Sequence, residues 1–149
     1  MRTLKFLLIS LALIGMTGCS CKKRAVDPEE NIALAEAGKE LVDINYGFDS
    51  YALSDAGKTA LDHHAEWLNA RQSIAIQIEG HCDERGTNEY NMALGAKRAR
   101  TAYDYLRAKG VAEARMSTIS YGEELPLDPR SNEAAWAKNR RAHFKVSRR

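Results

Sequence analysis

Four stretches of the chain have the residue pattern of β-strands. In three of them apolar and polar residues alternate, which is the period of a strand with one buried face. The apolar positions are Val42, Ile44, Tyr46 and Phe48 in the first, Ile74, Ile76 and Ile78 in the second, and Ala142, Phe144 and Val146 in the last. Residues 116–121 are predicted as a further strand. The pattern does not give the order of these strands in a sheet.

Helical patterns lie between the predicted strands. After a candidate N-cap at Ser54, four residues follow the i, i+3, i+4, i+7 spacing of a helix with one buried face. These residues are Leu61, His64, Ala65 and Leu68. A longer helix is predicted over residues 88–109, with Gly110 placed to end it, and a short one over residues 132–138. The order βαβα-β-α-β predicts an α/β two-layer sandwich with the helices over one side of a small mixed sheet.

The first eighteen residues have the composition of an export signal. Arg2 and Lys5 precede an apolar run that is well short of the roughly 20 residues needed to cross a bilayer, so we expect it to be cleaved. The sequence Met-Thr-Gly-Cys at 16–19 resembles a bacterial lipobox, although a Met at its first position is unusual. The resemblance implies that Cys19 is acylated. An ordinary signal peptide that leaves Cys19 unmodified is the alternative.

The expected domain organisation has three parts. Residues 1–18 are a lipoprotein signal peptide, residues 19–40 an acylated N-terminus with a flexible tether, and residues 41–149 one folded domain. Three acyl chains exceed the two signals that stable membrane anchoring requires. Ser20 would follow the acylated Cys19, which by resemblance to Gram-negative sorting rules favours the outer membrane, with the domain facing the periplasm.

The chain without its expected signal peptide has almost no net charge. The formal net charge is +2, and Arg2 and Lys5 in the expected signal peptide account for it, so the remaining chain is close to neutral. No basic patch indicates nucleic-acid binding. With Cys19 acylated, Cys21 and Cys82 remain; they do not suggest a disulfide framework, although export makes a bridge between them an alternative.

The densest group of chemically unusual residues spans residues 80–91, where the second strand leads into the long helix. A loop at the carboxyl end of a strand is where open α/β sheets place ligands. Asp83 lies in this loop, and seven residues separate Asn91 from Arg98, so both project from one helix face. Gly95 lies between them, and its missing side chain predicts a notch that a ligand could enter.

Asp83 and Arg98 together suggest recognition of a zwitterion. A guanidinium can bind a carboxylate through two charge-assisted hydrogen bonds, while a carboxylate accepts an ammonium group. An amino acid at the free end of a side chain presents both charges on one carbon. The alternative is an internal ion pair between Asp83 and Arg98 at the start of the helix, and the spacing does not decide between the two.

Residues 80–99 resemble the signature of OmpA-like peptidoglycan-binding domains. The matching residues are Gly80, His81, Asp83, Glu84, Arg85, Gly86, Thr87, Glu89, Tyr90, Asn91, Ala93, Leu94, Gly95, Arg98 and Ala99. The resemblance extends to Phe48 and Asp49, to residues 120–126 and to residues 133–142. Two places depart from the resemblance. At Cys82 the family usually carries Ala or Thr, and the segment 126–130 also differs from the family pattern.

The resemblance implies a ligand and a set of site residues. The ligand is the diaminopimelate side chain of the uncrosslinked peptidoglycan stem peptide. Asp83 would bind its ammonium group and Arg98 its carboxylate, with the backbone N–H groups around Phe48 and Asp49 completing the carboxylate site. Asn91 would support the pocket or touch the peptide. Two further residues, Arg140 and Arg141, would lie at the edge of the pocket.

The resemblance also implies partners and a place in the cell. Members of this kind are outer-membrane lipoproteins that bind TolB and other Tol proteins and link the envelope during constriction at cell division. The function implied is a non-catalytic anchor without a cofactor. A protein-interaction adaptor in the envelope, with a vestigial pocket, is the alternative.

An enzyme is the remaining hypothesis, with the adjacent residues His81, Cys82 and Asp83 as a metal or nucleophile cluster. Adjacent residues on an extended chain point to opposite sides, and the sequence has no HExxH or CxxC element that would supply further ligands. A Cys82 nucleophile would need a neighbouring base and a lowered pKa. We therefore expect no metal, no catalysis and a small buried thiol at Cys82.

Overall fold

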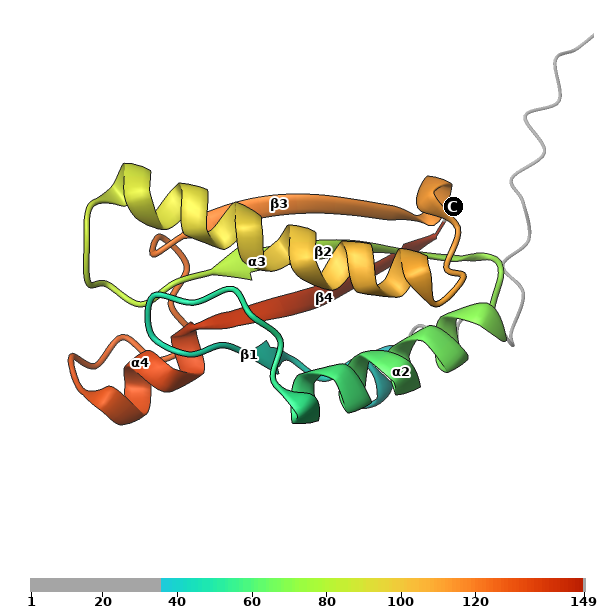
Figure 1. Cartoon of the computed structure of the whole chain (residues 1–149), viewed down its shortest axis with the longest axis horizontal. Helices are drawn as coiled ribbons and strands as arrows, with labels where there is room; N and C mark the ends of the chain where they lie inside the picture. The colour runs from blue at the N-terminus through green and yellow to red at the C-terminus, as the bar shows by residue number, and fades with distance from the viewer. Residues whose placement is uncertain (1–35, 149) are drawn as a thin grey trace, which may run out of the picture.

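The computed structural model describes residues 36–148, which fold into a mixed α/β domain (Figure 1). The strands are β1 (Ile44–Asn45), β2 (Ile74–His81), β3 (Met116–Gly122) and β4 (Arg141–Arg148). The helices are α2 (Asp55–Asn69), α3 (Asn88–Ala108), the single-turn 3₁₀ helix η1 (Glu113–Arg115) and α4 (Glu133–Asn139). The α/β class and the order of elements predicted from the sequence are confirmed. The predicted signal peptide and Cys19 lie outside the described residues.

The strands form one mixed sheet in the order β1-β4-β2-β3. Strand β4 pairs antiparallel with both of its neighbours, and β2 pairs parallel with β3. The last strand of the chain therefore lies inside the sheet between two strands that precede it. The parallel β2–β3 pair needs a crossover connection, which α3 supplies.

Helices α2 and α3 lie side by side over one face of the sheet (Figure 1). The alternating isoleucines of β2 point into this layer and are almost fully buried, and Phe144 of β4 lies beside Ile78. The predicted inner face of α2 is buried as well, including His64, which the sequence pattern placed there. The side chain of Ser54 caps α2 by accepting a hydrogen bond from the backbone N–H of Gly57 at 3.1 Å.

The first strand is shorter than its alternating pattern predicts. Only Ile44 and Asn45 pair in the sheet, and Val42 and Phe48 are 49% and 61% exposed. Phe48 lies beyond the strand end, in the loop that leads to α2, so the alternation does not apply to it. At the other end, residues 36–40 are helical and Ala37 is buried in the core, so the folded part begins before the boundary at residue 41 that the sequence suggested.

Helix α3 lies unusually close to the sheet at two glycines. A Cβ atom at Gly80 of β2 would overlap the carbonyl oxygen of Gly95, and one at Gly95 would overlap the hydroxyl of Ser120. The predicted ligand notch at Gly95 is therefore wrong, because the sheet itself fills that space. The two glycines let the helix backbone approach the strand, which sets the position of the residues on both sides of Gly95.

The other face of the sheet carries ionisable side chains. Asp43 pairs with Arg141 at 3.2 Å and with His143 at 2.8 Å. Successive residues of a strand point to opposite faces, so Arg141 and His143 point away from the buried Ala142 between them. Within residues 36–148, no helix is both long and apolar enough to cross a membrane.

Candidate functional site

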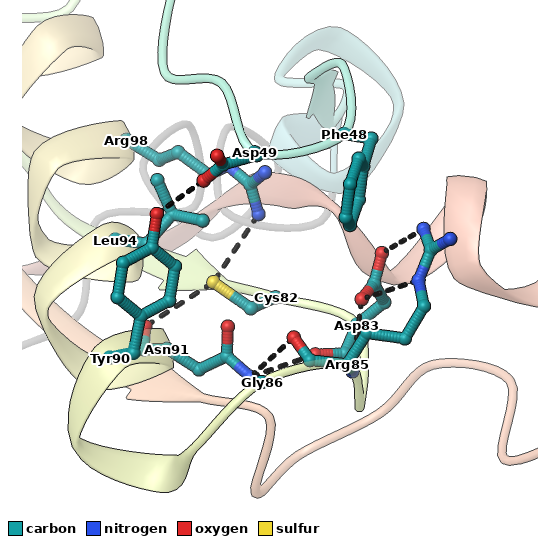
Figure 2. A pocket seen from close by; sticks show the side chains of 10 residues that line it. All are labelled: Phe48, Asp49, Cys82, Asp83, Arg85, Gly86, Tyr90, Asn91, Leu94 and Arg98. Carbon is teal, nitrogen blue, oxygen red and sulfur yellow. Dashed lines mark hydrogen bonds and ion pairs between the residues drawn. The ribbon is translucent and has the colours of Figure 1, made fainter.

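A cavity of about 230 Å³ lies at the end of the sheet where the β1–α2 loop, the β2–α3 loop and α3 meet (Figure 2). The first loop contributes Phe48 and Asp49, the second Cys82, Asp83, Arg85 and Gly86, and the helix Tyr90, Asn91, Leu94 and Arg98. The predicted pocket at the carboxyl end of β2 is therefore present. It brings together five of the seven residues that the sequence assigned to it.

Local backbone geometry shapes both loops. Gly86 has a φ of +122°, which a side chain would strain, and the next residue, Thr87, caps α3 by accepting a hydrogen bond from the N–H of Tyr90 at 3.2 Å. Asp49 has a φ of +51°, a left-handed conformation that Asp tolerates better than most residues. Its carboxylate accepts a hydrogen bond from the Tyr90 hydroxyl, which ties the first loop to the helix.

Arg98 is fully buried, and its guanidinium group donates to carbonyl oxygens from both loops. Nε donates to the Ser50 carbonyl at 2.8 Å, Nη1 to the His81 carbonyl at 2.8 Å, and Nη2 to the Gly47 carbonyl at 3.0 Å. No ion pair joins Arg98 to a carboxylate anywhere in residues 36–148. Burial lowers the pKa of Arg98, but a guanidinium stays charged in proteins. The wall of the cavity thus carries a positive charge that carbonyl dipoles hold in place without neutralising it.

Asp83 is also buried, but two arginines surround its carboxylate. Arg85 binds it through Nε at 3.3 Å and Nη2 at 2.8 Å, and Arg140 through Nη1 at 3.1 Å. Burial raises the pKa of Asp83, and the hydrogen bonds from Arg85 and Arg140 outweigh this effect and hold the pKa below its ordinary value. The internal ion pair between Asp83 and Arg98 that the sequence left open is absent among the described residues.

Aromatic rings enclose the Arg85 guanidinium. Its central carbon lies 4.1 Å from the centre of the Phe48 ring and 4.2 Å from that of Trp136. Arg85 also pairs with Glu133 of α4 at 3.6 Å. This places α4 beside the cavity. Arg85 was not predicted as a site residue, and the only signal for it in the sequence is that an Arg follows Asp83 by two residues in the same loop.

Cys82 and Asn91 are buried supports of the pocket. The thiol of Cys82 donates to the Asn91 carbonyl at 3.3 Å and accepts from Arg98 Nη1 at 3.3 Å. The side-chain amide of Asn91 donates to the carbonyl oxygens of Asp83 and Arg85 at 3.2 and 3.3 Å. Burial raises the pKa of the Cys82 thiol to about 11, so it lacks the lowered pKa of a nucleophile.

The other two predicted site residues do not line the cavity. Arg140 reaches it indirectly, because it binds Asp83 and donates to the Tyr46 carbonyl at 3.2 Å. Arg141 was placed at the pocket edge, which is wrong: it projects to the opposite face of the sheet and pairs with Asp43. No group of three or more His, Cys, Asp or Glu side chains within residues 36–148 could hold a metal ion.

Known proteins are similar to this chain in sequence. The OmpA family matches residues 45–140. A peptidoglycan-associated lipoprotein of Mesorhizobium japonicum is 42% identical over 143 residues, which cover 89% of this chain and 85% of the relative. One from Pasteurella multocida is 39% identical and covers 93% of this chain and 94% of the relative.

Solved structures resemble the fold. The crystal structure of the peptidoglycan-associated lipoprotein from Burkholderia pseudomallei has a TM-score of 0.72 and 38% identity, covering 77% of this chain and 99% of that one. The C-terminal domain of Helicobacter pylori MotB has a TM-score of 0.68 at 21% identity, covering 72% of this chain and 85% of that one, and it is similar in fold alone. The family match, the relatives and the shared fold show that this chain belongs to the OmpA family.

Proposed function

We propose that this chain is a non-catalytic lipoprotein that anchors the outer membrane to peptidoglycan by binding the diaminopimelate of the stem peptide. The observation that carries the proposal is Arg98, a fully buried guanidinium at a cavity with no carboxylate paired to it in the described residues. Burying a charge is unfavourable unless an opposite charge compensates it. A ligand carboxylate in the cavity would supply that compensation. The names of the relatives support peptidoglycan as its source.

The second charge of the pocket makes a zwitterion the best ligand. Asp83 remains ionised because its pKa is lowered, so it can accept an ammonium group. The distal end of diaminopimelate carries an ammonium and a carboxylate on one carbon. In this proposal Arg98 binds the carboxylate together with the backbone N–H groups of Phe48 and Asp49, and Asp83 binds the ammonium. Asn91 and Arg140 hold Asp83 and its loop in place.

Co-sedimentation with purified sacculi tests the proposal. The domain can be used without the N-terminal segment, because a solved relative whose chain corresponds to only 77% of this one crystallises as a folded unit. We expect residues 22–149 to pellet with diaminopimelate-containing sacculi. The Asp83→Ala and Arg98→Ala variants should stay in the supernatant, and Arg100→Ala on the exposed face of α3 should pellet like the wild type. A wild-type domain that does not pellet would refute the anchor.

The membrane anchor is the second part of the proposal. Acyl chains on Cys19 would hold the outer membrane, and the segment after it would let the domain reach the wall. Mass spectrometry of the protein extracted from membranes should find Cys19 as the N-terminal residue with three acyl chains. Cys19→Ser should release the protein into the soluble fraction. Recovery of an unmodified Cys19 would refute the acyl anchor, while the proposed wall-binding site would still stand.

We further propose that TolB and other Tol proteins are partners of this chain. Leu125 and Leu127, in the loop between β3 and α4, are 50% and 61% exposed, and these two neighbouring leucines are the apolar surface that we propose for the contact. Pull-down with TolB measures the interaction. If Asp83→Ala and Arg98→Ala keep both TolB binding and sacculus binding, the pocket is vestigial and the chain acts as a protein-interaction adaptor in the envelope.

A further inference from the structure

We propose that Arg85 is an internal occupant of the ammonium subsite, so that the ligand must displace it to reach Asp83. This inference rests on the proposed function, because it concerns the same cavity. It assigns Arg85 a role in specificity: only a ligand with a cation of its own can replace the guanidinium on Asp83. A ligand that offers a carboxylate alone would leave Arg85 where it is.

The Asp83 carboxylate is saturated with hydrogen bonds. An ionised carboxylate has about four lone-pair sites for hydrogen bonds. Oδ1 accepts from the backbone N–H of Arg85 at 3.1 Å and from its Nε at 3.3 Å, and Oδ2 accepts from Arg85 Nη2 at 2.8 Å and Arg140 Nη1 at 3.1 Å. These four donors fill the carboxylate. An ammonium group can bind with full hydrogen bonding only after one of the side chains withdraws.

Arg85 is held less firmly than Arg140 and is the arginine that withdraws. The Arg140 side chain is only 8% exposed, and it is also held by the Tyr46 carbonyl and by Glu133. The Arg85 side chain is 31% exposed and lies at the cavity surface, with Phe48 over one side of it (Figure 2). Glu133 lies 3.6 Å from Arg85 and offers a carboxylate for the displaced guanidinium. Arg85 can therefore leave Asp83 without losing every anionic partner, whereas Arg140 is held from several sides.

The aromatic contacts favour the occupied state before the ligand arrives. Phe48 and Trp136 both lie within about 4.2 Å of the Arg85 guanidinium, a distance at which a cation is attracted to the ring faces. The Trp136 indole N–H donates to Glu84 at 3.1 Å, which fixes the orientation of the ring. Displacement of Arg85 must therefore change the surroundings of Trp136. The only other tryptophan, Trp67, lies on α2 and provides an internal reference.

Titration with two matched peptides tests the proposal. One is a stem peptide with the distal amino and carboxyl groups of diaminopimelate free; the other is the same peptide acetylated on that amino group, which removes the positive charge. If Arg85 occupies Asp83 nine times in ten, Arg85→Ala should bind the free-amine peptide about tenfold more tightly than the wild type. The acetylated peptide should bind the two proteins with equal affinity. Arg100→Ala, which removes one charge from an exposed site, should match the wild type for both peptides.

A second measurement uses the wild-type protein alone and does not depend on a variant. In ¹H–¹⁵N spectra the free-amine peptide should shift the Trp136 indole signal and leave that of Trp67 in place, while the acetylated peptide should shift neither. Suppose that the wild type binds the free-amine peptide. If Arg85→Ala then binds it with unchanged or weaker affinity, or if the Trp136 signal does not move, Arg85 is not displaced, and the proposed wall anchor still stands. Binding of neither peptide by the wild type overturns the proposed function, and this inference with it.

Discussion

Replacement of Arg98 by Ala should affect folding and ligand binding separately, and the structure gives the size of each effect. The guanidinium donates to the carbonyls of Gly47, Ser50 and His81, and a hydrogen bond to a charged group contributes roughly 1.5–3 kcal/mol. Removal of a buried charge recovers part of this loss, because the charge no longer has to be kept out of water. We expect a net loss of about 2–4 kcal/mol in the free energy of unfolding.

The folded Arg98→Ala domain should also bind the stem peptide more weakly. Loss of one member of a buried charge pair costs on the order of 2–5 kcal/mol, which is a decrease in affinity of about 30-fold to 5,000-fold. Urea unfolding followed by tryptophan fluorescence measures the stability, and titration with stem peptide below the unfolding range measures the affinity. Arg98→Lys keeps the positive charge but lacks the two-pronged guanidinium, so its stability and its affinity should both lie between those of the wild type and of Arg98→Ala. A folded Arg98→Ala domain whose affinity changes by less than about threefold would show that the ligand carboxylate binds elsewhere.

Three further predictions follow from buried groups of the core and the pocket. Burial lowers the pKa of His64 to about 4, so the unfolded chain binds a proton at this residue that the folded chain does not as the pH falls from about 6.5 to 4. His64 should therefore contribute a drop of about 3 kcal/mol in the unfolding free energy over this range, and urea unfolding of His64→Leu should lack this contribution. Gly80→Ala should abolish cooperative unfolding, since its Cβ meets the backbone of α3, whereas Gly38→Ala, with nothing within 4 Å, should leave the melting temperature within a few degrees. Cys82 should react with a thiol reagent only after denaturant is added, because burial raises its pKa to about 11; equal rates in the folded and unfolded protein would contradict its burial.

The elements of the fold could be predicted from the sequence, while their arrangement could not. The cap at Ser54 and the end of α3 at Gly110 are local signals, and each appears as expected: Ser54 accepts from the N–H of Gly57 at 3.1 Å, and Gly110 has a φ of +89°. The position of β4 between β1 and β2 depends on pairing between residues far apart in the chain, which no local pattern encodes. The alternation in residues 42–48 failed at both ends because only two of these residues pair in the sheet.

The candidate site shows the same division. Asp83 and Arg98 were predicted to lie at one pocket, and both line it. Their partners could not be predicted, because the conformation of the loop decides that Asp83 meets Arg85 instead of Arg98. Arg141 was misplaced since the register of β4 determines which face each residue takes, and a shift of one residue exchanges the faces. Gly95 was misinterpreted because the sequence does not reveal how closely a helix approaches the sheet.

The central position of β4 also sets when this domain can fold during synthesis. Its residues leave the ribosome after those of β1, β2 and β3, yet they pair with β1 and β2, and Arg140 immediately before them completes the surroundings of Asp83. The sheet and the pocket therefore cannot form on a nascent chain that still lacks residues 140–148. The central position of β4 also means that proteolytic loss of the C-terminal strand would remove the middle of the sheet and disable a binding site built mainly from earlier residues.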